Sequence, residues 1–168
     1  GDKVVFKMPM HLTVRRWQVN QNSASVNYGP LTFSLDFKIR EEKVDSRKTA
    51  IGDSRWQPGA DPSQWPATEL YAASPWNYAL VLDKNGNVKN GEVIRKTWPS
   101  SNFPFTANDV PLEIKALGCR VPSWKVDSTG MCGVLPDDNA KVGASEPITL
   151  VPMGAVRLRI SAFPVVNR

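Results

Sequence analysis

Residues 31–39 read Leu31-Thr32-Phe33-Ser34-Leu35-Asp36-Phe37-Lys38-Ile39, the clearest period-two pattern in the chain. Apolar side chains occupy every odd-numbered position, and polar or charged side chains occupy the positions between them. Successive side chains of a β-strand point to opposite faces, so this alternation predicts a strand with one face on a core and the other in water. Such half-solvated strands are typical of antiparallel sheets.

Similar patterns lie on both sides of this strand. Alternation predicts strands over residues 4–14, 110–117 and 156–160, and short apolar runs predict strands at 78–82 and 148–150. Turn signals separate these runs, and in the segment 83–87 the pair Asn85-Gly86 favours a hairpin. About eight strands at this spacing predict an all-β fold, an antiparallel, jelly-roll-like β-sandwich.

Helices are expected to be short and few. The chain has 14 prolines and 11 glycines, and no segment sustains a helical period, so we expect at most one or two short helices, the best at 65–71. The polar stretches 40–67 and 127–146 predict long irregular segments, the first either an ordered functional excursion or mobile. A length of 168 residues suits a single domain over 1–168. The start at Gly1-Asp2 suggests a fragment of a larger protein.

The charge pattern bears on the class of partner. The chain has 21 Lys and Arg against 16 Asp and Glu, a net charge of +5. The basic residues are scattered and form no dense stripe, which disfavours a nucleic-acid partner. No apolar run approaches the ~18 residues of a transmembrane helix, which disfavours a membrane partner.

Residues for self-contained catalysis are sparse. His11 is the only histidine, and its place in an alternating run favours an ordinary strand residue over a catalytic base. One histidine and two cysteines without a CxxC pair do not make a zinc site, and no phosphate-binding glycine motif occurs. The pairs Glu41-Glu42 and Asp137-Asp138 lie in loop-like segments. We therefore expect no catalytic residue, no metal site and no cofactor in this chain.

Cys119 and Cys132 bracket the loop 120–131. A disulfide between them would restrain that loop and contribute on the order of 3 kcal/mol. The alternative is two buried free thiols. Both remain open, because the sequence does not place the two Cα atoms within bonding reach.

Several of the six tryptophans stand in proline-rich or polar segments. Exposed rings there can stack on sugars while neighbouring amides bind the hydroxyls, which makes carbohydrate contact one hypothesis. The favoured alternative is that the rings cap the sandwich or pack on another domain, because aromatic side chains dominate cores and interfaces. The candidate residues for either kind of contact are Trp56, Trp65, Trp76, Asn77, Tyr78, Trp98 and Trp124.

Four segments, taken in order, resemble one known family. They are Tyr28-Gly29-Pro30-Leu31, the run Ser74-Pro75-Trp76-Asn77-Tyr78, the run Arg120-Val121-Pro122-Ser123-Trp124, and the closing run 148–160 with Phe163-Pro164 after it. Together they resemble the C-terminal β-sandwich region of glycoside hydrolase family 127, the β-L-arabinofuranosidase-like proteins. The sequence departs from the family pattern at Ala79, where the family has glycine, and at Met153, where it has tyrosine.

The resemblance implies that catalysis belongs to another part of a parent protein. In that family a preceding (α/α)6 barrel holds a cysteine nucleophile, a glutamate and a zinc ion. Cys119 and Cys132 match none of these positions, so no catalytic residue is carried over. The resemblance implies the catalytic domain of the same parent chain as partner, with plant polysaccharide as a further one. It also implies a periplasmic or extracellular location.

Three functions are therefore expected, with the first favoured. The chain is a non-catalytic accessory domain that packs against and supports the barrel of a glycoside hydrolase acting on plant-type glycans, L-arabinofuranosides by resemblance. Alternatively, it is an independent carbohydrate-binding module with exposed rings such as Trp56, Trp65 and Trp76. The third possibility is a protein-interaction or adhesion domain.

Overall fold

The computed structural model describes residues 1–44, 61, 63–64 and 67–167. Contacts between residues group into two units, one of Gly1–Asp36 with Pro75–Arg168 and one of Phe37–Ser74. Each unit is described by itself. The expectation of a single domain over 1–168 stays a prediction.

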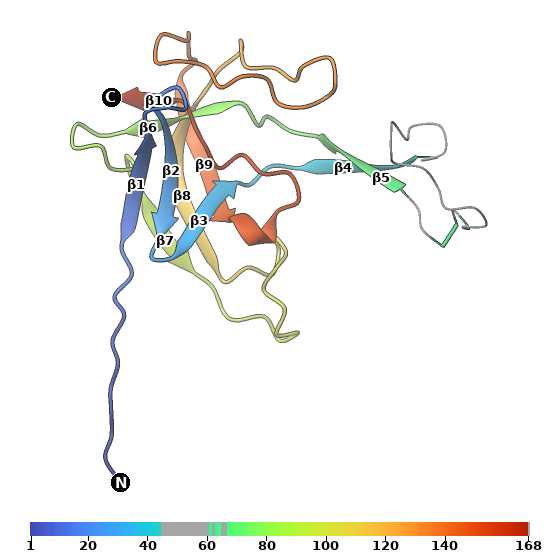
Figure 1. Cartoon of the computed structure of the whole chain (residues 1–168). Helices are drawn as coiled ribbons and strands as arrows, with labels where there is room; N and C mark the ends of the chain where they lie inside the picture. The colour runs from blue at the N-terminus through green and yellow to red at the C-terminus, as the bar shows by residue number, and fades with distance from the viewer. Residues whose placement is uncertain (45–60, 62, 65–66, 168) are drawn as a thin grey trace. The chain divides into compact units, whose positions relative to one another are not determined.

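One curled sheet of eight strands forms the larger unit (Figure 1). Seven strands follow the order β1-β2-β3-β9-β8-β6-β10, and β7 pairs with the start of β8. Neighbours are antiparallel except β6 and β10, which are parallel. The strands are β1 Leu12–Trp17, β2 Ser23–Tyr28, β3 Leu31–Leu35, β6 Tyr78–Leu82, β7 Glu92–Arg95, β8 Leu112–Arg120, β9 Ser145–Pro152 and β10 Val165–Asn167.

The fold class predicted from the alternation is confirmed. Strands dominate the residues that the structure describes, and the curled sheet gives a sandwich-like all-β fold. Within the described residues the one helical element is the single 3-10 turn η1, Met153–Ala155. The strands β3, β6, β8 and β9 contribute fully buried side chains, which include Phe33, Leu35, Leu80, Ile114 and Leu150. Burial of one such side chain stabilises the folded state by about 1.5–3 kcal/mol.

The segment Ile160 to Phe163 completes the sheet where β2 and β3 diverge. Ala24 and Phe163 exchange both backbone hydrogen bonds, and the Leu35 N–H donates to the Ile160 carbonyl at 2.9 Å. Phe163 is fully buried. This insertion holds Ser161 beside β3, at the margin of the polar surface described below.

The smaller unit contains a two-stranded antiparallel sheet of β4 Ile39–Val44 and β5 Ala67–Ala72. The short helix predicted at 65–71 is therefore wrong for residues 67–71, and residues 65–66 lie outside the described residues. Pairing with β4 across six positions satisfies the backbone of β5 instead. The Arg40 guanidinium lies 4.7 Å from the centre of the Tyr71 ring, a cross-strand contact that favours this register.

Most predicted strands are confirmed, with altered limits. Residues 78–82 form β6, residues 148–150 lie in β9, and the run 110–117 lies mostly in β8. The run 31–39 is divided into β3 and β4 by an interruption at 36–38. The hairpin turn at 83–87 is confirmed, since Gly86 has a φ of +80° and the Asp83 carboxylate accepts from the Asn85 and Asn87 N–H groups.

Two predicted strands are wrong. The run 4–14 forms a strand only from Leu12, and Val4, Phe6 and Met8 are 92, 81 and 75% exposed and pair with no strand among the described residues. Residues 156–160 form no strand. Here Arg159 Nε donates to the carbonyls of Met153 and Val156, both at 3.1 Å, so that local contacts replace a ladder.

Candidate functional site

Asn77 is the centre of a buried hydrogen-bond network that joins two of the family-like segments. Its side-chain amide donates to the carbonyls of Val121 and Trp124, each at 2.9 Å. Its oxygen accepts from Arg120 Nε at 3.0 Å. Trp124 is buried, and Trp76 packs edge-on against it with ring centres 5.0 Å apart. The residues Trp76, Asn77 and Trp124 therefore hold the fold together at this point.

Tyr78 follows Asn77 into the core at the start of β6. Its hydroxyl donates to the Glu146 carboxylate, and the Arg120 guanidinium lies 5.4 Å from its ring centre. Burial, and then the hydrogen bond to Glu146, raise the pKa of the Tyr78 hydroxyl. At neutral pH the phenol is therefore a neutral donor, buried beside β8 and β9 and withheld from contact with an external sugar.

Trp98 has the opposite setting, since it is 57% exposed. Its indole N–H donates to Asn102 Oδ1 at 2.8 Å, which fixes the ring at the surface. The ring forms one wall of a cavity of about 470 Å³, which we call the apolar groove. The groove is lined by Pro30, Leu31, Thr32, Trp98, Pro104, Phe105, Val110, Pro111, Leu112, Pro152, Met153, Gly154 and Ala155.

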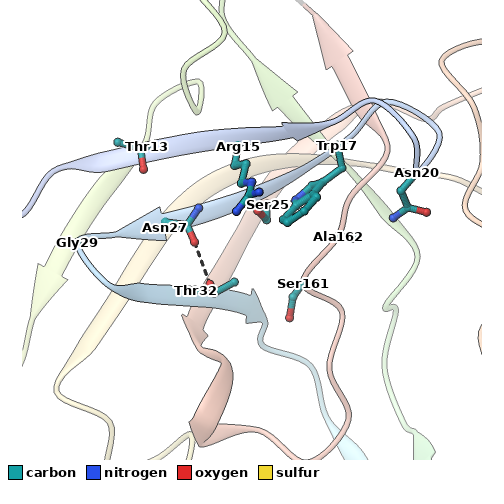
Figure 2. Close-up of a pocket in the computed structure, with 10 residues that line it drawn as sticks. All are labelled: Thr13, Arg15, Trp17, Asn20, Ser25, Asn27, Gly29, Thr32, Ser161 and Ala162. Atoms are coloured by element: carbon teal, nitrogen blue, oxygen red, sulfur yellow. Dashed lines mark hydrogen bonds between the residues drawn. The ribbon is translucent and has the colours of Figure 1, made fainter.

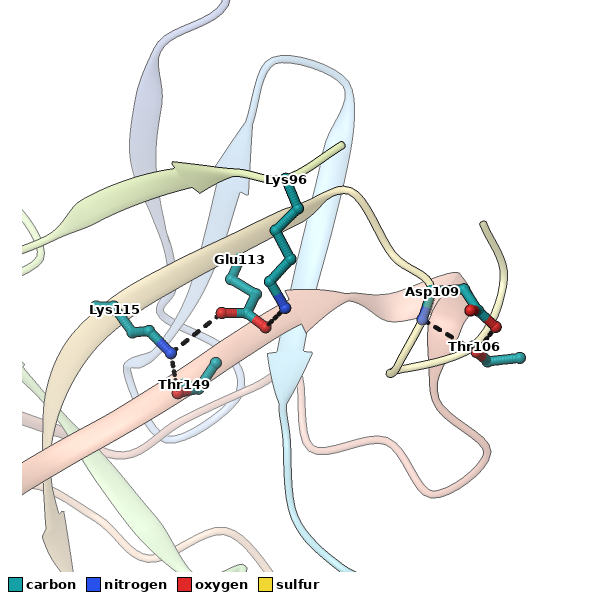
Figure 3. Close-up of polar contacts among 6 residues, drawn as sticks. All are labelled: Lys96, Thr106, Asp109, Glu113, Lys115 and Thr149. Carbon is teal, nitrogen blue, oxygen red and sulfur yellow. Dashed lines mark hydrogen bonds and ion pairs between the residues drawn. The ribbon is translucent and has the colours of Figure 1, made fainter. Parts of the chain in front are cut away.

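The loop between β7 and β8 positions the aromatic wall of the apolar groove. The Thr106 hydroxyl donates to the Asp109 carboxylate at 2.6 Å and accepts from the Asp109 N–H at 3.2 Å (Figure 3). Phe105, next to this turn, is 60% exposed and lies edge-on to Phe103 with ring centres 5.2 Å apart. A turn fixed by its own side chains thus presents aromatic rings to solvent.

A second cavity lies over β1, β2 and β3, and we call it the polar groove. Its volume is about 600 Å³, and it is lined by Thr13, Arg15, Trp17, Asn20, Ser25, Asn27, Gly29, Thr32, Ser161 and Ala162 (Figure 2). Pairing places Thr13 opposite Asn27 and Asn27 opposite Thr32, which makes one row across three strands. Arg15 lies opposite Ser25 in the neighbouring row.

Side-chain contacts fix the polar groove from within. The Arg15 guanidinium lies over the Trp17 ring, 3.9 Å from its centre, and the Trp17 indole N–H donates to the Ser25 hydroxyl at 3.0 Å. At the other end the Thr32 hydroxyl donates to Asn27 Oδ1 at 2.9 Å. Among the described residues that line the groove, none is acidic.

Glu113 on β8 is the centre of a charged cluster outside both grooves. It forms ion pairs with Lys96 and with Lys115, the latter at 3.1 Å, and Lys115 also donates to the Thr149 hydroxyl at 3.0 Å (Figure 3). Partial burial pulls the pKa of Glu113 upward, but hydrogen bonds from the two lysines outweigh it and hold that pKa below its ordinary value. Burial and the nearby Glu113 charge raise the pKa of Asp36.

The cysteines are free thiols in the structure, Cys119 buried in β8 and Cys132 exposed. The alternative of two buried thiols is therefore wrong for Cys132, and a disulfide between the two cysteines stays a prediction. Cys119 is enclosed between Ala79 of β6 and Ser145 of β9, whereas Cys132 pairs only with Val126 in the following loop.

Two of the sequence candidates, Trp56 and Trp65, lie outside the described residues. Sequence reasoning did not single out Trp17, Asn27 or Thr32, although they share a groove with Arg15. The available signal was the same alternation used to find strands: Thr13, Arg15 and Trp17 occupy one face of β1. Register between strands, which the sequence does not specify, brings Asn27 and Thr32 beside them.

Among the described residues, no group of three or more His, Cys, Asp or Glu side chains comes together as a metal site. In the same part of the chain, no helix is long and apolar enough to cross a membrane. No protein-family model, curated protein or solved structure matches the chain.

Proposed function

We propose that this chain is a non-catalytic accessory domain that docks through its apolar groove on the catalytic barrel of a glycoside hydrolase. The observation that carries the proposal is the exposure of Trp98 and Phe105, with Met153 41% exposed beside them. Folded monomers rarely expose contiguous apolar surface of this kind, and aromatic residues are enriched at the centres of protein interfaces. The groove therefore fits another protein surface better than water.

The nature of the parent enzyme rests on the resemblance of four segments to family 127. Two of them, 74–78 and 120–124, meet in the Asn77 network, which gives a physical reason for their occurrence together. On this proposal the parent acts on plant-type glycans such as L-arabinofuranosides, holds its zinc in the barrel, and works in the periplasm or outside the cell.

The N-terminal segment supports the same function. Val4, Phe6 and Met8 are largely exposed in a stretch that leads directly into β1. An extended apolar stretch gains backbone hydrogen bonds and loses contact with water when it pairs with a neighbouring sheet. A docked catalytic domain provides that neighbour.

The aromatic and amide residues first considered for sugar contact give little support to the carbohydrate-binding alternative. Among their described members Trp98 alone is exposed, while Trp124, Asn77 and Tyr78 are buried and Trp76 packs on Trp124. The protein-interaction alternative uses the same apolar groove with a different partner. The test therefore has to identify which protein occupies that groove.

The experiment measures binding between this chain and the remainder of its parent protein by sedimentation or calorimetry. We expect the double variant Trp98→Ser/Phe105→Ser to bind at least about tenfold more weakly, because aromatic anchors dominate interface energies. Val134→Ser is the matched control, since Val134 is 85% exposed but lies outside the groove. Equal binding by wild type and double variant contradicts the docking surface, and glycoside hydrolysis by this chain alone contradicts the accessory role.

A further inference from the structure

Three kinds of polar group line the polar groove: hydroxyls, amides and one guanidinium. Hydroxyls both donate and accept hydrogen bonds, amides provide both functions on separate atoms, and a guanidinium donates only. A ligand with many hydroxyls needs partners of both kinds, so this lining fits a sugar. In Figure 2 the side chains come from the three adjacent strands β1, β2 and β3, with Asn20 and Ser161 added from connecting segments.

The Arg15 guanidinium is fixed in an orientation that can bind an anion. Its guanidinium stacks on Trp17 at 3.9 Å from the ring centre, and Trp17 is itself fixed by its bond to Ser25. Among the described residues no carboxylate forms an ion pair with Arg15. A planar guanidinium binds a carboxylate through two parallel hydrogen bonds, a match that a single ammonium does not provide.

Asn27 adds donors beside this cation. Its side-chain oxygen already accepts from Thr32, so its amide NH₂ group remains for a ligand. The row Thr13, Asn27 and Thr32 crosses three strands at a spacing of about 4.8 Å per strand. Hydrogen-bond donors therefore extend along the groove from the guanidinium. This arrangement suits an oxygen-rich ligand that is longer than a single sugar unit.

We infer that the polar groove binds an acidic oligosaccharide, with a sugar carboxylate on Arg15 and hydroxyls on Asn27 and Thr13. Trp17 acts as a positioning residue, because it orients the guanidinium through its ring face. The inference does not rest on docking through the apolar groove, since the two grooves share only Thr32.

The test is a calorimetric titration of the whole chain with three probes. Tetragalacturonate supplies carboxylates on a sugar, its methyl ester supplies the same sugar without charge, and polyglutamate supplies carboxylates without sugar. We expect saturable binding of tetragalacturonate, with the ester and polyglutamate each at least about tenfold weaker, because the charge-assisted and hydroxyl contacts both contribute.

Variants assign the binding to this groove. Arg15→Gln and Asn27→Asp should each weaken tetragalacturonate binding at least about tenfold, the second because it places a negative charge beside the ligand. Lys84→Gln removes the same charge as Arg15→Gln but lies in the exposed 83–87 turn, so its binding should stay within about twofold. The inference is overturned if no probe binds at millimolar concentration, if the ester or polyglutamate binds as well as the acid, or if Arg15→Gln and Lys84→Gln behave alike.

Discussion

Asn77 illustrates how much one buried amide stabilises this fold. Replacing it with alanine removes the side-chain donor to the Trp124 carbonyl and the acceptor of Arg120 Nε, and leaves the Val121 carbonyl with the Trp124 N–H alone. Unpaired buried polar groups are costly, so we expect Asn77→Ala to lower the free energy of unfolding by about 2–4 kcal/mol. Urea unfolding monitored by tryptophan fluorescence measures this loss.

Asn108→Ala is the matched control, because Asn108 is exposed in the loop before β8. We expect its unfolding free energy to lie within about 0.5 kcal/mol of wild type. Similar losses in the two variants would show that Asn77 is not a structural centre and would return it to the candidates for ligand contact.

Glu113 and Asp36 should respond to pH with opposite signs. The pKa of Glu113 lies below its ordinary 4.5 in the folded chain, so its ionised form stabilises the fold above that pH, and the gain is lost as pH falls through the folded pKa. The pKa of Asp36 lies above its ordinary 3.8, so its ionised form destabilises the fold at neutral pH, and the penalty disappears on acidification.

The corresponding variants are Glu113→Gln and Asp36→Asn. At pH 7 we expect Glu113→Gln to lower the melting temperature by about 1–2 °C, as for a modest surface ion-pair network, and Asp36→Asn to raise it. Thermal scans between pH 7 and pH 3 should show both differences shrinking toward the acid end. A loss of melting temperature at pH 7 in both variants would contradict the opposite signs.

The chemical character of individual residues was predictable, but their environment was only partly so. Trp98 and Trp124 both stand near prolines in the sequence, which does not distinguish exposed Trp98 from buried Trp124. The difference depends on tertiary contacts, since Trp124 donates to the Gly133 carbonyl at 3.0 Å and packs on Trp76. In the sequence Arg15 is one of many scattered basic residues. Strand pairing places it opposite Ser25, and its guanidinium lies over the Trp17 ring.

At the scale of elements, β8 is a strand that is paired along both edges. It pairs with β9 along one edge and with β7 and then β6 along the other. At Gly118 an added Cβ would lie 3.0 Å from two Ile148 carbons and 3.1 Å from Tyr78 Cδ1. These neighbours belong to β9 and β6, so a larger residue strains three strands together.

We therefore expect Gly118→Ala to destabilise the fold by about 1–3 kcal/mol, as overpacking of a core does. Gly143→Ala provides the comparison, because its Cβ would meet nothing closer than 3.8 Å. Chemical denaturation of both variants measures the difference. A Gly118→Ala variant as stable as Gly143→Ala would mean that Ile148 and Tyr78 move aside at no cost.

Strand positions were predictable where a strand is apolar enough to show its period. The five consecutive buried residues of β6 were found with their exact limits, 78–82. In contrast, β2 reads Ser-Ala-Ser-Val-Asn-Tyr, and its small polar residues hide a strand whose members are nearly all buried. Residues 156–160 alternate as a strand does, yet they pair with no strand of the described chain, and Arg159 hydrogen-bonds to local carbonyls instead.

At the scale of the whole molecule, sequence patterning predicts the sandwich-like class but not the order of strands. Hairpin neighbours such as β1 and β2 follow from short connections, but the pairing of β3 with β9 joins residues more than a hundred positions apart. The parallel pairing of β10 with β6 is equally non-local. The apolar groove brings residues of β3 beside Pro152 and Met153 at the end of β9, and the polar groove takes Ser161 and Ala162 from the distant segment 160–163, so neither complete lining was available from the sequence.

The N-terminal segment exposes apolar side chains that a domain stable by itself would normally bury. β1 is an edge strand of the larger sheet, and the stretch before it carries exposed Val4, Val5, Phe6 and Met8. An apolar extended segment next to an edge strand is a template for pairing with a second chain. In isolation, copies of the chain should therefore associate weakly through this segment.

Sedimentation velocity over a tenfold or greater range of protein concentration measures that association. We expect the apparent mass of wild type to rise with concentration, and the double variant Val4→Lys/Phe6→Lys to remain monomeric with an unchanged melting temperature, because these side chains bury nothing in the monomer. Val19→Lys/Val134→Lys, at two valines that are 100 and 85% exposed outside this segment, adds the same charge and is the control for altered net charge. If wild type stays monomeric throughout, or if the double variant associates equally, the N-terminal segment is not the surface through which copies of the chain associate.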